Sequence, residues 1–427
     1  MTGEEKYILR TFQNSFCNQK NARICLYGTG AHTWKLLQRL SDYNICGVMD
    51  LSCKNDEFQL LSEEEVEQNC DFIVIIARPM YTKKIYTKIR GSLKHIPIYS
   101  LEGVDLDINQ QKEKMDIELY LKKTEELVKT EQDRCVFEWF REHIAVMPRQ
   151  ENGSINVEDM YTFVNVFLAP LIVNVFIWVV RQAKEKKCDF LLFPSRDGYW
   201  LYQMYLLIKE NGTVGLPDAC YFYTSRQALL NAEKNIPNGA MDNYRKYLER
   251  LRIDEKENIG IYDFCARGTV QLHLEEILQK KLLGLYYVKL PLENAPIEVC
   301  SYSGQGKNYY QLNSFAQRYY PLTEMLFSAA HGSVEGIDAE GNPIFEPAQM
   351  NEDIAREIGQ AIMDCFDELL KKTDDIYNAE FSHELIDNIV DMIRIARITL
   401  DDKVKKSFVA KNCFYGEIFD FFRDILI

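Results

Sequence analysis

The chain has 427 residues, enough for about three domains, and its 47% hydrophobic and 12% aromatic content is typical of a folded globular protein. With 64 acidic and 50 basic residues the formal net charge is −14, which argues against a nucleic-acid partner while leaving room for local basic pockets. The 12 cysteines form no C-x-x-C pair and the 6 histidines show no ligand spacing, which favours free thiols in a reducing cytoplasm over disulfides or a zinc site.

The N-terminal residues do not have the form of a signal peptide. Met1-Thr-Gly-Glu-Glu-Lys6 is polar and is not followed by the apolar core that a signal peptide places behind a basic start. Together with the cysteine pattern, this predicts a cytoplasmic protein.

The first predicted unit carries a glycine-rich loop between a strand and a helix. An apolar strand over residues 23–28 runs into Gly28-Thr-Gly30-Ala-His-Thr33, which is the dinucleotide-binding fingerprint G-x-G-x-x-G with its third glycine replaced. Gly28 and Gly30 are the glycines that permit a tight turn and a close approach of the backbone to a phosphate. A second strand ends at Asp50, about where a ribose-binding acid belongs.

Further strands over residues 71–77 and 95–99, with a helix between them, complete a Rossmann-like domain that we assign to residues 1–106. It resembles the small nucleotide-binding modules attached to bacterial surface-sugar enzymes. Four strands make only about half of a full dinucleotide site. A nucleotide or nucleotide-sugar is therefore the first ligand hypothesis, and NAD or a purely structural role are the alternatives.

A charged segment separates this unit from the next. Gly103-Val-Asp105-Leu-Asp107-Ile-Asn109 resembles the D-x-D-x-T/V nucleophile loop of haloacid dehalogenase-type phosphatases, but Asn109 stands where that loop has a hydroxyl or a valine. A charged helical run follows instead of a compact catalytic core. We therefore predict a domain boundary and a helical linker over residues 107–160.

Residues 161–180 form the most apolar window and are long enough to span a membrane. The window contains Asn165, Pro170 and Asn174, which are costly in hydrocarbon, and it has charged flanks. A helix buried beneath a sheet explains it without a membrane, so we expect no membrane span.

Three successive predicted strands of the central region end in polar motifs. Residues 189–194 lead into Ser195-Arg196-Asp197-Gly198, residues 219–224 lead into Ser225-Arg226, and residues 259–262 lead into Asp263. The short loop Phe264-Cys-Ala-Arg267-Gly268-Thr269 follows, then a helix over 270–280 and a strand over 283–290. Open α/β sheets bind ligands at the carboxyl ends of their strands, so these motifs predict one ligand site.

The remainder of the chain shows less chemistry. His331 precedes a predicted hairpin over residues 334–345, and a lone histidine in a turn is more often structural than catalytic. Residues 348–427 are expected to be helical, with residues 161–347 forming the central domain. The expected fold class is α/β, with two separate, mostly parallel sheets, a helical linker and a helical C-terminal region.

Residues 163–347 resemble the domain that accompanies haloacid dehalogenase-like modules in bacterial capsule and O-antigen biosynthesis proteins. The residues that carry the resemblance are Phe193-Pro-Ser-Arg-Asp-Gly198, Tyr221-Phe-Tyr-Thr-Ser-Arg226, Asp263-Phe-Cys-Ala-Arg-Gly-Thr-Val-Gln271 and Ser328-Ala-Ala-His-Gly-Ser333. It implies a role in bacterial surface-glycan biosynthesis. A phosphatase module is not expected, because no complete D-x-D-x-T/V motif occurs.

The same segment also resembles a type I phosphoribosyltransferase core, which implies roles for its polar residues. Ser195 to Gly198 would form the pyrophosphate loop, Asp263 would bind the ribose hydroxyls, and Arg267, Gly268 and Thr269 would hold the 5-phosphate. Mg²⁺ would bridge the pyrophosphate oxygens. The chain departs from that family by having Tyr262-Asp263 in place of two adjacent acids and by lacking a full T-G-x-T loop.

These observations predict a transferase that uses an activated sugar phosphate, such as phosphoribosyl pyrophosphate, with Mg²⁺ and a possible glycan acceptor. The alternatives are a non-catalytic nucleotide or nucleotide-sugar scaffold protein of the same pathway and a haloacid dehalogenase-related hydrolase. The predicted catalytic residues are Arg196, Asp197 and Asp263. The predicted phosphate-binding residues are Ser195, Gly198, Arg226, Arg267, Gly268 and Thr269, and Gly28, Gly30 and Asp50 are predicted to hold the N-terminal ligand.

Overall fold

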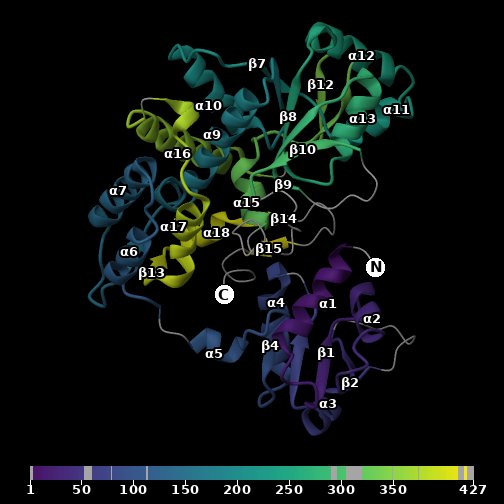
Figure 1. The fold of residues 1–427 in the computed structure, drawn as a ribbon, viewed down its shortest axis with the longest axis vertical. Coiled ribbons are helices and arrows are strands. Elements are labelled where there is room, and N and C mark those ends of the chain that lie inside the picture. The colour runs from purple at the N-terminus through teal and green to yellow at the C-terminus, as the bar shows by residue number, and fades with distance from the viewer. Residues whose placement is uncertain are drawn as a thin grey trace.

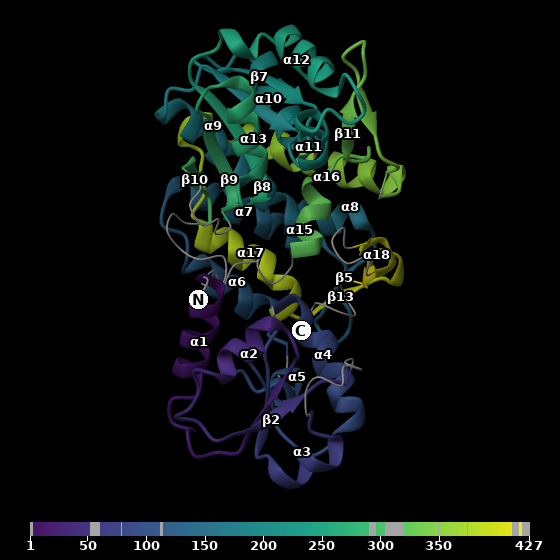
Figure 2. The same ribbon diagram turned by 90° about the vertical axis from the view of Figure 1, so that its right-hand side faces the viewer.

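A computed structural model describes residues 3–51, 60–77, 79–111, 114–289, 296–303, 320–348, 350–373, 375–411 and 418–420. An N-terminal α/β module lies at one end of the molecule and a second α/β unit at the other, with a layer of helices between them (Figures 1 and 2). The α/β fold class with two mostly parallel sheets is confirmed.

The N-terminal sheet has four parallel strands in the order β2-β1-β3-β4, and their bounds are Ile45–Met49, Ile24–Tyr27, Phe72–Ile75 and Ile98–Ser100. Its inner strands β1 and β3 are short apolar runs buried on both faces, as expected where helices cover a parallel sheet. Leu26 and Val74 belong to one core, whereas Cys25 and Ile73 belong to the core on the other face. The helices of the module are α1 (Gly3–Ser15), α2 (Ala31–Leu37), α3 (Glu63–Asn69) and α4 (Pro79–Ser92).

The segment resembling a D-x-D loop is held in local structure next to helix α5 (Leu106–Gln111). The carboxylate of Asp107 accepts a hydrogen bond from the Tyr86 hydroxyl at 2.7 Å and forms an ion pair with Arg90. Asp105 accepts from the Ile108 N–H at 3.0 Å. Both acids therefore have structural partners, in keeping with a domain boundary.

The second sheet has five parallel strands in the order β10-β9-β8-β6-β7, with bounds Glu298–Ser301, Leu283–Lys289, Ile259–Ala266, Phe190–Pro194 and Asp218–Phe222. Alternate residues of its strands face different cores. Leu192 and Ile261 pack with the side chains of helices α11 (Arg226–Glu233), α12 (Ala240–Arg250) and α13 (Thr269–Leu278). Phe193 and Phe264 pack on the opposite face, in a larger core.

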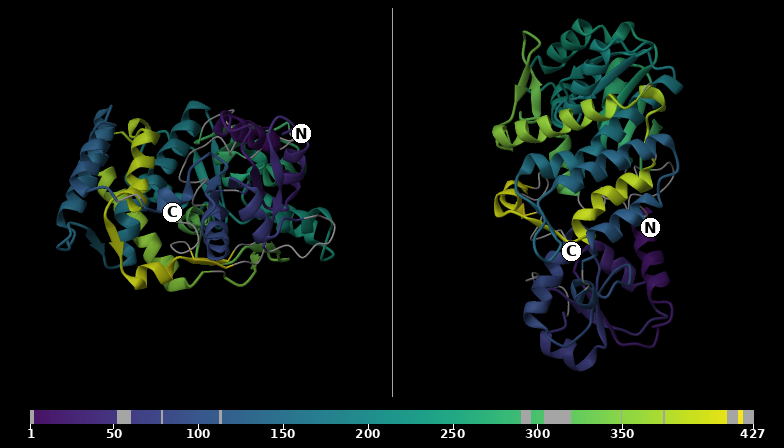
Figure 3. Two further views of the ribbon diagram at one scale, coloured as in Figure 1. Left: turned by 90° about the horizontal axis from the view of Figure 1, so that it is seen from below. Right: turned by 90° about the vertical axis from the view of Figure 1, so that its left-hand side faces the viewer.

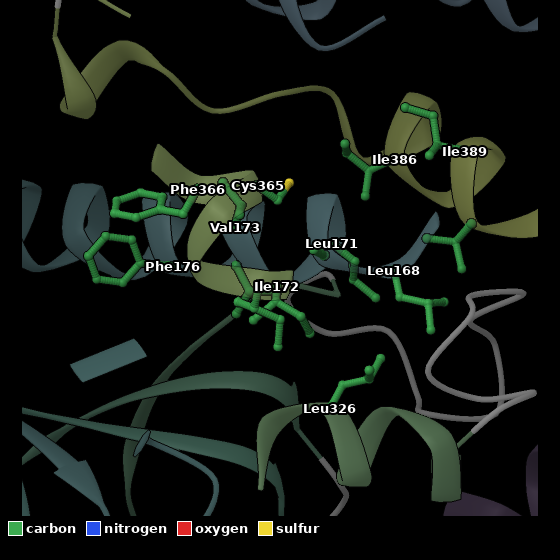
Figure 4. Packing of buried hydrophobic residues seen from close by; sticks show 14 of the residues in the cluster. Leu168, Leu171, Ile172, Val173, Phe176, Leu326, Cys365, Phe366, Ile386 and Ile389 are labelled. Atoms are coloured by element: carbon green, nitrogen blue, oxygen red, sulfur yellow. The ribbon is translucent and has the colours of Figure 1, made fainter. Parts of the chain in front are cut away.

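The apolar window expected to be a buried helix runs through that larger core. It comprises α8 (Met160–Phe163), a π-helical turn (Val164–Leu168) and α9 (Ala169–Glu185). By length and composition Met160–Glu185 could cross a membrane, but 100% of its apolar window is buried inside the protein, as in a core helix. Figure 4 shows Phe176 of α9 beside Phe366, and their ring centroids are 5.3 Å apart.

The π-helical turn has a local cause. Pro170 has no N–H group and cannot make the regular bond to Val166, so the backbone loosens by one residue in this region. The N–H of Ala169 donates instead to the carbonyl of Val164, five residues earlier.

The helices expected as linker and C-terminal region share the core of the central unit. Side chains of α6 (Ile117–Glu125) and α7 (Glu131–Val146) pack in it with those of α16 (Glu352–Leu370) and α17 (His383–Ile395). Figure 3 shows α16 and α17, in yellow, lying among the earlier helices, in blue. The segments are helical as predicted, but the boundaries at 160 and 347 do not separate bodies with cores of their own.

Short strands also occur in these segments, where only helix was expected. β13 (Ile398–Leu400) pairs in parallel with β5 (Ile155–Val157), and β14 (Val409–Lys411) pairs with β15 (Ile418–Asp420). The β-branched residues of these runs favour extended backbone. The helix expected for residues 348–427 is therefore wrong at 398–400, 409–411 and 418–420, and residues 412–417 and 421–427 lie outside the described residues.

The hairpin predicted over 334–345 is confirmed as β11 (Val334–Ile337) paired antiparallel with β12 (Pro343–Phe345). At its turn the Asn342 N–H donates to the Asp338 carboxylate at 2.7 Å. Helix α15 (Tyr320–Phe327) precedes the hairpin and leads toward His331.

Candidate functional site

The three polar motifs follow strands that are neighbours in the sheet. β6 lies between β7 and β8, and all three run in parallel, so their carboxyl ends meet at one edge. Pro194 of β6 pairs with Phe222 of β7, and Leu192 of β6 pairs with Ile261 of β8. If the pairing of β6 with β8 is extended by two residues beyond Leu192 and Ile261, Pro194 lies beside Asp263. The fold thus brings the predicted residues to the same edge.

Asp263 lies inside a strand and not after its end, which corrects the expected strand boundary at residue 262. β8 continues to Ala266 because its last part still pairs with β9, with Asp263 opposite Tyr286 and Ala266 opposite Lys289. Pairing with β6 stops at Ile261. β8 therefore extends beyond β6, and Asp263 stands next to the turn that follows β6.

Ser195 joins the ends of β6 and β7. Its N–H donates to the carbonyl of Phe222 at 2.8 Å, and its hydroxyl donates to the carbonyl of Thr224 at 2.6 Å. The same hydroxyl accepts the Thr224 N–H at 3.2 Å. This buried serine thus has a structural role that its predicted role in phosphate binding did not include.

The turn after Ser195 is tightly constrained. Arg196 has a φ of 69°, in the left-handed region, and its N–H donates to the Tyr221 hydroxyl at 2.9 Å. Its guanidinium donates to the Ser333 hydroxyl at 2.9 Å and lies 3.6 Å from the Glu324 carboxylate. A Cβ atom on Gly198 would lie 2.7 Å from the carbonyl oxygen of Pro194, so glycine is required there.

His331 belongs to this network. Its Nδ1 lies 2.8 Å from the carbonyl of Gly332, which makes Nδ1 the protonated nitrogen, and Nε2 lies 2.6 Å from the Tyr221 hydroxyl. Nε2 therefore accepts a hydrogen bond from the Tyr221 hydroxyl, and the oxygen of that hydroxyl accepts one from the Arg196 N–H. Burial lowers the pKa of His331, which keeps the ring neutral. This arrangement supports a positioning role for His331.

The two aspartates of the site repel each other. Burial and, next, the charge of Asp197 raise the pKa of Asp263 to about 7, and the Phe264 N–H, Arg226 and Lys289 oppose the shift. Burial also raises the pKa of Asp197, which Arg196 opposes. Both side chains keep some solvent exposure although protein atoms surround them closely. The edge thus holds a carboxylate pair with cationic side chains around it.

Lys289 is a member of this edge that was missed from the sequence. It is the last residue of β9, and its ammonium donates to the carbonyl of Arg267 at 2.6 Å. Burial lowers its pKa, whereas Asp263 raises it. The sequence did contain a signal for it: Lys289 ends the apolar strand that follows the Asp263 motif, so it could have been expected at the same sheet edge.

The loop before α13 shows why its glycine is needed. Gly268 has a φ of 94°, and a Cβ there would lie 2.2 Å from the side chain of Ile297. Gly268 is the N-cap of α13 and Thr269 is its first residue, with no side-chain cap on the free N–H groups. Arg267 and Arg226 are exposed at the same edge. Backbone N–H groups and cationic side chains therefore coincide there.

The N-terminal residues also stand where the sequence predicted. Gly28 and Gly30 lie between β1 and α2, and Asp50 follows β2 directly. One oxygen of the Asp50 carboxylate accepts the N–H of Thr29 at 3.1 Å and its hydroxyl at 2.8 Å. Asp50 therefore holds the glycine loop in place, a role that the fingerprint alone did not indicate.

No protein-family model and no curated protein matches this chain. Among solved structures, a candidate sugar binding protein from Salmonella typhimurium LT2 is 13% identical, with a TM-score of 0.16 over 70% of this chain and 86% of that one. A Mn-bound periplasmic metal binding protein from Candidatus Liberibacter asiaticus is 10% identical, with a TM-score of 0.17 over 68% of this chain and 95% of the other. Likenesses this weak carry no information about fold or function.

Proposed function

We propose that the second α/β unit binds an activated sugar phosphate with Mg²⁺ and acts as a transferase in bacterial surface-glycan biosynthesis, with phosphoribosyl pyrophosphate as the donor. The observation that carries the proposal is the repelling pair Asp197 and Asp263 beside Arg226 and Lys289. Two neighbouring carboxylates lie there with a cationic side chain on either side, which suits a ligand that combines a metal ion with phosphates.

The two carboxylates fit a divalent cation. Mg²⁺ prefers carboxylate and phosphate oxygens and keeps several waters, so one or two protein carboxylates are enough to hold it. A cation between Asp197 and Asp263 would remove the repulsion that raises the pKa of Asp263. Bound there, Mg²⁺ would neutralise charge on the departing pyrophosphate.

The remaining residues have separate roles in this proposal. The Asp263 carboxylate accepts hydrogen bonds from sugar hydroxyls, while Arg226 and Lys289 neutralise phosphate charge. The N–H groups at Gly268 and Thr269 hold the terminal phosphate, because the first turn of a helix binds anions. Departure of pyrophosphate leaves a positively charged sugar, and fixed cations aimed at the leaving group stabilise that transition state.

The test is a binding titration followed by a turnover assay. Phosphoribosyl pyrophosphate, ribose 5-phosphate, nucleotide-sugars and NAD are titrated with and without Mg²⁺, and melting is followed at each concentration. A ligand at about 100 times its Kd adds roughly 2.7 kcal/mol of stability. We expect the pyrophosphate donor to bind only with Mg²⁺ and to release pyrophosphate when a glycan acceptor is added.

A matched pair of variants ties the result to the site. Asp263→Asn should lower donor affinity at least tenfold, because hydrogen bonds to a charged carboxylate contribute about 1.5–3 kcal/mol. Asp218→Asn changes the first residue of β7. This residue lies at the amino end of the strand, opposite the carboxyl ends that form the site, so the variant should leave donor affinity unchanged. Equal effects of the two variants would exclude the proposed site.

A second candidate function is a non-catalytic nucleotide or nucleotide-sugar scaffold. The Gly28-Thr29-Gly30 loop favours it, because this loop, its strand and Asp50 meet as in nucleotide-binding folds. Binding that persists in Asp263→Asn, without turnover, would support this function. Release of inorganic phosphate instead of pyrophosphate would favour the hydrolase alternative.

A further inference from the structure

Helices α11 and α13 carry a second cluster of metal-ligand side chains, none of which belongs to the sheet-edge site described above. Glu233 is the last residue of α11, and His273 and Glu276 lie in α13. One ligand atom from each of these side chains lies within 4.8 Å of the other two. His273 Nδ1 is already hydrogen-bonded to the Glu233 carboxylate.

The fold determines this convergence. His273 and Glu276 are three residues apart on one helix, so their side chains share a face. Leu229 and Ala232 of α11 pack in the same core as Leu274 of α13, and Figure 1 shows the two helices close together. The ligands therefore stand on packed helices and not on loops, which is where preorganised sites are built.

We propose that Glu233, His273 and Glu276 bind a divalent transition-metal ion, of which Zn²⁺ and Mn²⁺ are the probes to use. One imidazole and two carboxylates suit such ions, and three protein ligands leave positions for water. Two atoms that each lie about 2.1 Å from a zinc ion are at most roughly 4.2 Å apart. Small side-chain rotations thus bring the observed set to binding distance.

The charges of the cluster also favour a cation. With a neutral imidazole the three side chains carry two negative charges in a small volume, which a divalent ion compensates. A simple His–Glu ion pair would need only His273 and Glu233, whereas metal binding needs Glu276 as well. Bound metal would also link α11 to α13, the helices that begin at Arg226 and Thr269.

The experiment uses the full chain after chelator treatment and dialysis. Zn²⁺, Mn²⁺ and Mg²⁺ are titrated by calorimetry, and Co²⁺ is added to read ligand geometry from its visible absorption. We expect one equivalent of Zn²⁺ or Mn²⁺ to bind, with affinity lowered at least tenfold in Glu276→Gln and Glu233→Gln and lost in His273→Ala. His273→Asn, checked by melting, separates loss of binding from loss of folding.

Two controls make the outcome decisive. His383→Ala removes a comparable pair, His383 with Glu380 at 2.9 Å, that belongs to no such three-ligand group in the described part of the chain. Asp263→Asn alters the proposed Mg²⁺ site alone. Both variants should keep the Zn²⁺ or Mn²⁺ equivalent. Absence of binding, binding unchanged in Glu276→Gln, or binding lost in Asp263→Asn would each overturn the proposal, and the last would assign the ion to the sheet edge.

Discussion

Asn174 and Phe381, 207 positions apart, are joined by two reciprocal hydrogen bonds. The Asn174 side-chain amide donates to the Phe381 carbonyl at 3.0 Å, and the Phe381 N–H donates to the Asn174 side-chain oxygen at 2.8 Å. The same amide donates to the Tyr302 hydroxyl at 2.8 Å. This fully buried asparagine therefore fixes the chain before α17 against α9.

Asn174→Ala should destabilise the protein by roughly 2–4 kcal/mol, because it leaves both backbone groups of Phe381 buried and unpaired. Asn165→Ala should cost less, since the Asn165 side chain makes a hydrogen bond only to the carbonyl of Ala361, at 2.9 Å, among the bonds described here. Chemical denaturation of the two variants measures the difference. Equal losses would show that cavity formation, and not the paired backbone, controls stability here.

The two glycines of the N-terminal loop should behave differently on substitution. Gly28 has a φ of 121°, which an alanine rarely adopts, so Gly28→Ala should destabilise the protein by about 1 kcal/mol or more. Gly30 has a φ of −63°, and an added Cβ would have no atom within 4 Å, so Gly30→Ala should cost less than Gly28→Ala, about 0.5 kcal/mol for the poorer N-cap of α2.

Ligand titration completes this test. If the loop binds a nucleotide, Gly30→Val should lower affinity sharply by blocking approach of the phosphate to the backbone, and the space around a Cβ at Gly30 gives no reason to expect unfolding. Nucleotide titrations that coincide for Gly30→Val and the unaltered chain would leave the loop with a structural role only.

Cys70 of the N-terminal module has a pKa below the ordinary thiol value. The thiols of Cys25 and Cys46 hydrogen-bond to it and Arg23 lies near, which lowers its pKa to about 7 against the opposing effect of burial. It lines a cavity of about 460 Å³ together with Glu67, Asp71, His95, Ile96 and Pro97. Thiolates react and thiols do not, so alkylation of Cys70 should rise with pH around a midpoint near 7.

Iodoacetamide labelling across a pH series, read by peptide mass spectrometry, measures that midpoint. Cys70→Ser should remove the labelled peptide without changing labelling elsewhere. A midpoint near 9, the ordinary thiol value, would mean that the neighbouring thiols do not stabilise the thiolate.

The sequence predicted the positions of the strand-end motifs because local signals determine them. Gly28, Gly198 and Gly268 each mark a turn that the backbone requires, and apolar runs mark the strands before them. The extension of β8 past Asp263 was not predictable, since it depends on pairing with β9. Strand order depends on tertiary structure. Lys289 lies near Asp263 because β9 is the neighbour of β8 in the sheet.

The hydrogen-bond partners of buried polar groups could not be predicted from the sequence either. Arg196 bonds to Ser333, 137 positions later, and nothing local in either segment indicates the other. The apolar window around Asn174 predicted burial correctly, but not that residues near Phe381 would cover it. Long-range packing of this kind also explains why the C-terminal helices share the central core.

The pH dependence of stability provides a direct test of the Asp263 environment. Its pKa is about 7 in the folded protein and 3.8 as the ordinary value, so the folded state holds a proton that the unfolded state releases between these pH values. The free energy of unfolding should therefore fall as pH rises from about 4 to 7, and the loss should be complete above pH 7.

Asp263→Asn should flatten that part of the stability curve, because an amide does not ionise, and above pH 7 it should be at least as stable as the unaltered chain. Saturating Mg²⁺ should raise the stability of the unaltered chain above pH 7 and have a smaller effect on Asp263→Asn, since a cation stabilises the ionised pair with Asp197. Asp218→Asn, at the amino end of β7, should keep the original pH slope of stability.

If Asp263 served instead to hold the loop before α13, for example through Arg267, its replacement would lower stability at every pH and leave the slope in place. Measuring the free energy of unfolding of these variants at several pH values decides between two roles of Asp263. Its carboxylate is either destabilised in the ionised form and available to a ligand, or it supports the fold.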